Sequence, residues 1–197
     1  MLSNQKKSVE HILEPLIKPL ARVNPNLLTL LGSIPSLLFF VFVLNHWYIP
    51  ALIAFVGSAF DLLDGMVARK YNKVTLFGAF FDSSLDRVSD FLITSSFAFA
   101  GIVRWEITAP FLLFSFMISY TRSRSETLAK DKTVSFAIGI MERTERLLLT
   151  ILALILFILF PNTIFLKLNI AEWVFIILGV LSFYTMLQRI LYAYKKL

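Results

Sequence analysis

The chain lacks cysteine and has few charged residues. None of its 197 residues is cysteine, and only 16% are charged. The missing cysteine excludes disulfide bonds and thiolate chemistry. No internal repeat and no low-complexity linker interrupts the sequence, so we expect a single domain over residues 1–197. Apolar residues are abundant instead, at 57% of the chain, and the mean hydropathy is +0.75.

Long apolar runs predict an all-α integral membrane protein. A helix that crosses about 30 Å of hydrocarbon needs roughly 20 mostly apolar residues. Several runs approach that length, each bounded by turn residues or by charge, and they predict six transmembrane helices. The predicted spans are 27–46, 49–68, 78–102, 107–128, 147–165 and 171–193.

Residues 4–22 predict an N-terminal amphipathic helix that lies in the membrane interface. Apolar side chains such as Val9 and Leu13 recur at helical spacing on one face, and charged side chains such as Lys6 and Glu10 lie on the other. A signal peptide does not fit, because the segment contains acidic residues and lacks both an apolar core and a small-residue cleavage site.

Positive charge is distributed unevenly between the two ends of the predicted spans. Of the 19 lysines and arginines, only Arg104 and Lys167 fall in the connections after spans one, three and five. The positive-inside rule therefore places the 69–78 loop, the 122–146 segment and both termini in the cytoplasm of a multi-pass cell-membrane protein. The same rule, with attraction to anionic head groups, accounts for the net charge of +6, so we expect no nucleic-acid partner.

Four aspartates interrupt this apolar sequence at helical spacing. Asp61 and Asp64 are three residues apart and Asp82 and Asp86 are four apart, so each pair shares one face of a helix. Carboxylates near hydrocarbon are costly unless they are paired or bind metal. Their oxygens favour Mg²⁺ or Mn²⁺, and four of them suit two ions, as in phosphoryl transfer. Asp64 and Asp82 should lie roughly 6–8 Å below the cytoplasmic boundary, and all four aspartates near that face, which predicts an active site facing the cytoplasm.

The aspartates belong to a longer pattern, Asp-x2-Asp-Gly-x2-Ala-Arg-x8-Gly-x3-Asp-x3-Asp, which begins at Asp61 and ends at Asp86. It resembles the signature of the CDP-alcohol phosphotransferases, six-span membrane enzymes of phospholipid synthesis. The resemblance implies that Asp61, Asp64 and Asp82 are metal ligands. It implies that Asp86 is both a ligand and the general base that deprotonates the attacking hydroxyl. Asp90 lies one turn further on, outside the pattern, and we expect it to be a supporting or structural carboxylate.

The resemblance also implies a site for the cytidine diphosphate part of a CDP-linked lipid. Gly65 and Ala68 leave a bare helix face on which a phosphate can approach the backbone, although close helix packing explains Ala68 equally well. The lipid tails of diacylglycerol and of archaeol suit such a protein equally. The residues assigned to the donor are Pro25, Asn26, Leu27, Gly65, Ala68, Arg69 and Thr75.

A cluster of arginines and glutamates lies at the end of the fourth predicted span and in the segment after it. Arginine's bidentate fork suits a second phosphate, and an ordinary charged cytoplasmic loop is the alternative. The stretches 120–126 and 139–147 resemble those of phosphatidylinositol phosphate and archaetidylinositol phosphate synthases, whose acceptor is inositol phosphate. The chain departs from the bacterial pattern at Thr144, where proline is common, and at Arg122, where lysine is common. The residues that match the acceptor phosphate site are Arg122, Arg124, Arg146 and Arg189.

These patterns together predict an enzyme that transfers the phosphatidyl or archaetidyl group of a CDP-linked lipid to the hydroxyl of inositol phosphate and releases CMP. The resemblance further implies a homodimer. Glycerol 3-phosphate and serine are alternative acceptors, of which a phosphorylated one fits the arginines better. A divalent-cation transporter is an alternative of a different class, since intramembrane carboxylates also mark ion pathways. Transport sites tend to lie near the midplane between repeats, however, and these aspartates lie close to one face.

Overall fold

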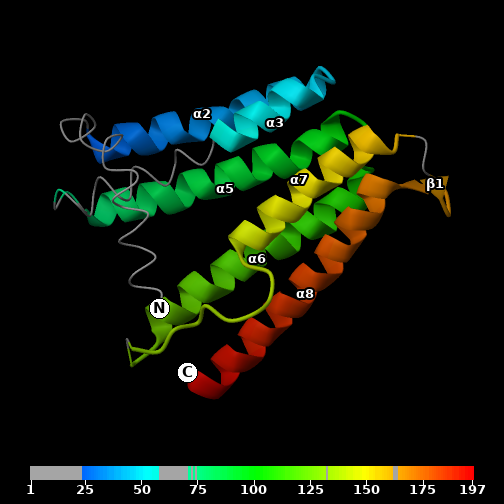
Figure 1. Cartoon of the computed structure of the whole chain (residues 1–197). Helices are drawn as coiled ribbons and strands as arrows, with labels where there is room; N and C mark the ends of the chain where they lie inside the picture. The colour runs from blue at the N-terminus through cyan, green and yellow to red at the C-terminus, as the bar shows by residue number, and fades with distance from the viewer. Residues whose placement is uncertain (1–23, 58–70, 72, 74, 132, 162–163) are drawn as a thin grey trace, which may run out of the picture. The chain divides into compact units, whose positions relative to one another are not determined.

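A computed structural model describes residues 24–57, 71, 73, 75–131, 133–161 and 164–197. The predicted interfacial helix at 4–22 lies outside them. Chain contacts divide the molecule into two compact units. The described residues of the first fall within Met1–Phe40 and Ile49–Leu92, and those of the second within Val41–Tyr48 and Ile93–Leu197. In chain order the elements are α2 (Pro25–Leu44), α3 (Tyr48–Gly57), α5 (Leu76–Phe99), α6 (Trp105–Leu128), α7 (Arg143–Leu159), β1 (Ile164–Phe165), β2 (Leu168–Asn169) and α8 (Ile170–Lys196) (Figure 1).

The described helices follow the order of the predicted spans. Among the described residues, α2 and α8 are long and apolar enough to cross a membrane. The others overlap predicted spans but differ from these two in length or charge. For example, α7 has 17 residues, and α5 contains three aspartates and an arginine.

The prediction of a span over 147–165 is wrong at its C-terminal end. α7 ends at Leu159, and Ile164–Phe165 instead forms strand β1, which pairs antiparallel with β2. Pro161 has no N–H to donate and its ring clashes with the preceding turn, so the helix does not continue through it. Among the described residues this hairpin is the β-structure, and the other regular elements are helices.

In the first unit, small polar residues and aromatic rings join the helices. The buried Ser36 hydroxyl of α2 donates a hydrogen bond to Ser89 Oγ of α5 at 3.0 Å. Phe39 packs edge-on against Phe55 of α3, with ring centroids 6.3 Å apart. Small residues at such contacts let helix backbones approach closely, which is how helices associate where apolar burial offers little driving force.

In the second unit, α6 and α8 lie side by side around an aromatic core (Figure 1). The buried ring of Phe175 on α8 contacts Phe97 and Phe111, with centroids 4.8 and 5.6 Å away. α8 begins with a capping box: Asn169 Oδ1 accepts the Glu172 N–H, and Glu172 Oε2 accepts the Asn169 N–H. Arg104 Nε donates to the same Glu172 carboxylate at 2.7 Å, and Asn169 Nδ2 donates to the Ile102 carbonyl.

Candidate functional site

Two of the predicted donor-binding residues meet at the first turn of α5. Thr75 Oγ1 accepts a hydrogen bond from the Gly78 N–H at 2.9 Å, the interaction of a helix N-cap. A Cβ atom on Gly78 would lie 3.0 Å from Thr75 Oγ1 and 3.1 Å from Asn26 Oδ1. The absence of a side chain at Gly78 therefore leaves room for both polar groups.

The remaining predicted donor residues divide into two sets. Pro25 is the first residue of α2, where its missing N–H costs nothing, and Leu27 is exposed in the same turn. Gly65, Ala68 and Arg69 lie outside the described residues.

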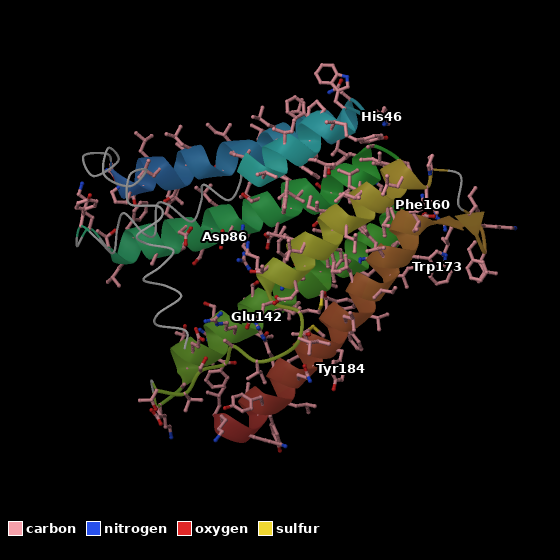
Figure 2. All side chains as sticks on the ribbon, in the orientation of Figure 1. His46, Asp86, Glu142, Phe160, Trp173 and Tyr184 are labelled. Atoms are coloured by element: carbon pink, nitrogen blue, oxygen red, sulfur yellow. The ribbon has the colours of Figure 1, made fainter. Side chains whose placement is uncertain are left out.

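α5 carries the predicted carboxylates Asp82 and Asp86 one turn apart. Their four-residue spacing puts both on one face of the helix, and Asp90 continues that face as a buried residue. The Asp86 side chain, which Figure 2 labels on α5, is 18% exposed. Asp61 and Asp64 lie outside the described residues.

Within the described residues no group of three or more His, Cys, Asp or Glu side chains is placed to hold a metal ion. Asp82 and Asp86 nevertheless fit a share of such a site. They supply hard carboxylate oxygens from one rigid helix, which are the ligands that Mg²⁺ and Mn²⁺ prefer.

Arg87 is a neighbour of this site that the sequence patterns do not identify. Its Nη2 lies 3.5 Å from Asp86 Oδ2, and its side chain is 32% exposed. Its guanidinium adds positive charge beside the predicted base and ligand Asp86. The only sequence signal was its position directly after Asp86.

The second unit holds all four predicted acceptor arginines, in two different settings. Arg122 and Arg124 are exposed near the C-terminal end of α6, and Arg122 Nε donates to Glu126 Oε1 at 3.0 Å. Arg146 and Arg189 are buried, with 3% and 4% of their surface exposed. Exposed guanidinium groups can exchange partners at little cost, whereas buried ones must be satisfied by their surroundings.

The buried arginines donate to backbone carbonyls. Arg189 Nε donates to the Ile138 carbonyl and its Nη1 to the Ile118 carbonyl, both at 2.7 Å, so this α8 side chain joins α6 to the 129–142 loop. Arg146 Nη1 donates to the Met141 carbonyl at 3.0 Å. The two hydrogen bonds of Arg189 use two of the five N–H donors that a guanidinium carries.

The loop packs tightly against α8 at Gly139. Its φ of +110° is rare for residues with a side chain, and a Cβ there would lie 2.3 Å from Thr185 Cγ2. Two residues later, the Met141 N–H donates to Thr185 Oγ1 at 3.2 Å.

Near the start of the loop, the Thr133 hydroxyl and N–H both donate to Asp131 Oδ1 and lower the pKa of that carboxyl.

This geometry holds the arginines at one end of the second unit. Arg189 lies close enough to Arg122, Glu126 and Glu142 for their charges to interact, and Figure 2 shows Glu142 where the loop meets α7. Two buried guanidinium groups, held by hydrogen bonds to the loop, and two exposed ones lie at this end of the unit. Together they suit the binding of a compact anion. Sequence reasoning missed Gly139, Thr185 and Met141, although Gly139 and Met141 lie within the matched 139–147 stretch.

Comparison with known proteins adds three findings. The CDP-alcohol phosphatidyltransferase family matches residues 22–194. Archaetidylinositol phosphate synthase of Pyrococcus horikoshii is 38% identical over 200 aligned residues, which cover 100% of this chain and 98% of the relative. Phosphatidylinositol phosphate synthase of Mycobacterium tuberculosis with CDP-DAG bound superposes with a TM-score of 0.78 at 24% identity, over 93% of this chain and 94% of that one. A second structure of that enzyme, with manganese and citrate, has a TM-score of 0.71 at 26% identity and covers 91% and 88%.

Proposed function

This chain belongs to the CDP-alcohol phosphatidyltransferase family, and from that premise we propose that it transfers the phosphatidyl or archaetidyl group of a CDP-linked lipid to the hydroxyl of inositol phosphate. The acceptor hydroxyl attacks the lipid-proximal phosphorus, the phosphoanhydride bond breaks and CMP leaves. The observation that carries the proposal is the pair Asp82 and Asp86, one turn apart on a helix whose first turn holds Thr75 beside Gly78. The name of the archaeal relative, which matches the whole chain, supports inositol phosphate as acceptor.

For the metal site, we propose two Mg²⁺ or Mn²⁺ ions held by Asp61, Asp64, Asp82 and Asp86. The manganese structure of the mycobacterial enzyme supports a divalent ion of this kind. When bound, the ions supply charge stabilisation to the attacking and leaving oxygens. Asp86 takes the proton of the acceptor hydroxyl. Its side chain is only partly exposed to solvent, which suits that role.

For the donor, we propose that Pro25, Asn26, Leu27, Gly65, Ala68, Arg69 and Thr75 hold the cytidine diphosphate. The packing of Asn26 and Thr75 about Gly78 supports these two of the four donor residues that the structure describes. The apolar tails of diacylglycerol or archaeol would then lie among the helices in the bilayer.

For the acceptor, we propose that Arg122, Arg124, Arg146 and Arg189 surround the phosphate of inositol phosphate. The electrostatic proximity of Arg122 and Arg189 supports a shared anion site. The buried pair keeps the loop in place through carbonyl hydrogen bonds, and the exposed pair is available to a ligand from solvent.

For the setting, we propose a single-domain homodimer in the cell membrane, with six spans, an interfacial helix at 4–22 and an active site facing the cytoplasm. The apolar helices support membrane association, and the asymmetry of positive charge supports the orientation. Cross-linking of the purified protein in bilayers measures the oligomeric state, and a solely monomeric product would contradict the dimer.

The test is a substrate panel. Purified protein in lipid vesicles receives CDP-diacylglycerol or CDP-archaeol with inositol phosphate, inositol, glycerol 3-phosphate or serine, and CMP release is recorded. We expect rapid release with inositol phosphate and little with inositol. Equal rates with serine or free inositol would contradict the phosphate site and leave only the family chemistry. A lack of CMP release with every acceptor would contradict the transferase itself.

A further inference from the structure

The β1–β2 hairpin, residues 164–169, presents apolar side chains to its surroundings. Ile164, Phe165 and Leu166 are 71%, 63% and 70% exposed, and Lys167 is exposed beside them. Three successive exposed large apolar residues at the tip of a hairpin indicate a surface that is covered by something other than this chain.

The turn of this hairpin places two residues with large side chains at positive φ, a backbone conformation that favours glycine. Leu166 and Lys167 connect the two strands, and both have positive φ, 52° and 62°. Two-residue hairpin turns of this kind favour glycine and asparagine, because other residues meet steric strain there. The tip thus carries a leucine and a lysine in strained conformations.

The hairpin is a rigid extension of α8. Asn169 ends β2 and caps α8 directly, and the Trp173 Nε1–H donates to the Phe165 carbonyl at 3.1 Å. The Phe165 and Trp173 rings also pack together, with centroids 5.8 Å apart. Because α8 is one of the two described helices that are long and apolar enough to cross a membrane, its depth determines the depth of the hairpin.

All three tryptophans of the chain lie at this end of the helices of the second unit. Trp47 follows α2, Trp105 begins α6 and Trp173 lies in the first turn of α8; the first two are 58% and 41% exposed. Figure 2 shows Trp173 near the hairpin end of α8, away from Tyr184 towards its other end. Tryptophan concentrates where a bilayer meets water, so these rings mark an interface at the level of the hairpin.

We propose that the hairpin is an anchor whose tip enters the head-group region of the leaflet opposite the arginines. Phe165 and Leu166 lie against the glycerol and upper acyl chains, and the Lys167 ammonium reaches a lipid phosphate. The continuity of the hairpin with α8 and the tryptophan level favour lipid over a protein partner. The anchor sets the vertical position of α8 and therefore of Arg189 at its far end.

The lack of cysteine makes a direct depth measurement simple. Leu166→Cys and Lys167→Cys each introduce a single thiol for a nitroxide label into the full chain. The labelled protein is placed in vesicles of phosphatidylcholine with a minority of phosphatidylglycerol. Collision rates with oxygen, which concentrates in lipid, and with a water-soluble nickel chelate are measured by electron paramagnetic resonance. Lys130→Cys, exposed beyond α6, serves as the aqueous control, and Val180→Cys, 62% exposed along α8, as the hydrocarbon control.

At position 166 we expect an oxygen-to-nickel collision ratio several-fold above that at 130 and below that at 180. Position 167 should give an intermediate ratio, closer to the aqueous control. A ratio at both tip positions equal to that at 130 would overturn the proposal, because the tip would then lie in water. Low collision rates with both reagents, accompanied by dipolar broadening between labels, would overturn it in favour of a contact between two copies. None of these outcomes depends on the transfer reaction.

Discussion

Substituting Gly139 tests whether the 129–142 loop is held against α8 as the structure indicates. Gly139→Ala faces two separate penalties. The φ of +110° costs an L residue about 1–2 kcal/mol, and a Cβ 2.3 Å from Thr185 Cγ2 adds overpacking of about 1–3 kcal/mol. We therefore expect a loss of about 2–5 kcal/mol in the free energy of unfolding.

Two further variants separate the penalties. Gly101 has a φ of +70° with nothing within 4 Å of its Cβ position, so Gly101→Ala should show the backbone penalty alone. Thr185→Ser removes Cγ2 but keeps the Oγ1 that accepts the Met141 N–H. In a double-mutant cycle, Thr185→Ser should rescue Gly139→Ala with a coupling energy of about 0.5–3 kcal/mol.

The assay is thermal unfolding of the purified chain in one detergent, followed by circular dichroism. For a chain of this size each kcal/mol shifts Tm by about 2–4 °C. We expect Tm to be highest for the wild type, lower for Gly101→Ala and lowest for Gly139→Ala. The Tm of the Gly139→Ala/Thr185→Ser double variant should lie above that of Gly139→Ala. Equal Tm values for the two glycine variants, or the absence of rescue, would refute the close contact between loop and α8.

Three further predictions concern the site. Removal of divalent metal with EDTA should abolish CMP release and added Mg²⁺ or Mn²⁺ should restore it; full activity after thorough chelation would rule out the metal site. Asp86→Asn should bind CDP-lipid substantially while turnover collapses, whereas Asp82→Asn should also weaken Mn²⁺ binding in calorimetry; identical losses would show that Asp86 acts chiefly as a ligand. Arg122→Ala should raise the acceptor's KM about 10- to 150-fold, because it removes a charge-assisted contact of about 1.5–3 kcal/mol. Tm and the donor's KM should not change. A change confined to the donor's KM would show that Arg122 binds the CDP-linked lipid instead.

Periodicity and spacing predicted the helices better than their ends. Apolar runs located α2, α5, α6 and α8 to within a few residues, because an apolar run of about that length favours a helix that satisfies its backbone internally. The hairpin after α7 was missed because Ile164 and Phe165 are as apolar as the helix before them. Pro161 was the local signal that the helix had already ended.

In the candidate site, features set by residues close in sequence could be predicted, and those set by residues far apart in sequence could not. The four-residue spacing of Asp82 and Asp86 predicted a shared helix face, and the structure has both on α5. The buried settings of Arg146 and Arg189 could not be predicted, because their partners are carbonyls that no side-chain pattern reveals. Ile118, which accepts from Arg189, lies 71 residues away in the chain.

Two hydrogen bonds between α8 and the residues of and just before α6 have a consequence for insertions and deletions. Arg104, directly before α6, donates to Glu172 in the first turn of α8, and Arg189, further along α8, donates to the Ile118 carbonyl within α6. One added residue in α8 between these points would turn Arg189 by about 100° and move it about 1.5 Å along the axis, away from both carbonyls that it serves. The 17-residue separation of Glu172 and Arg189 along α8 is therefore a fixed length, and changes of chain length should be tolerated far better outside it.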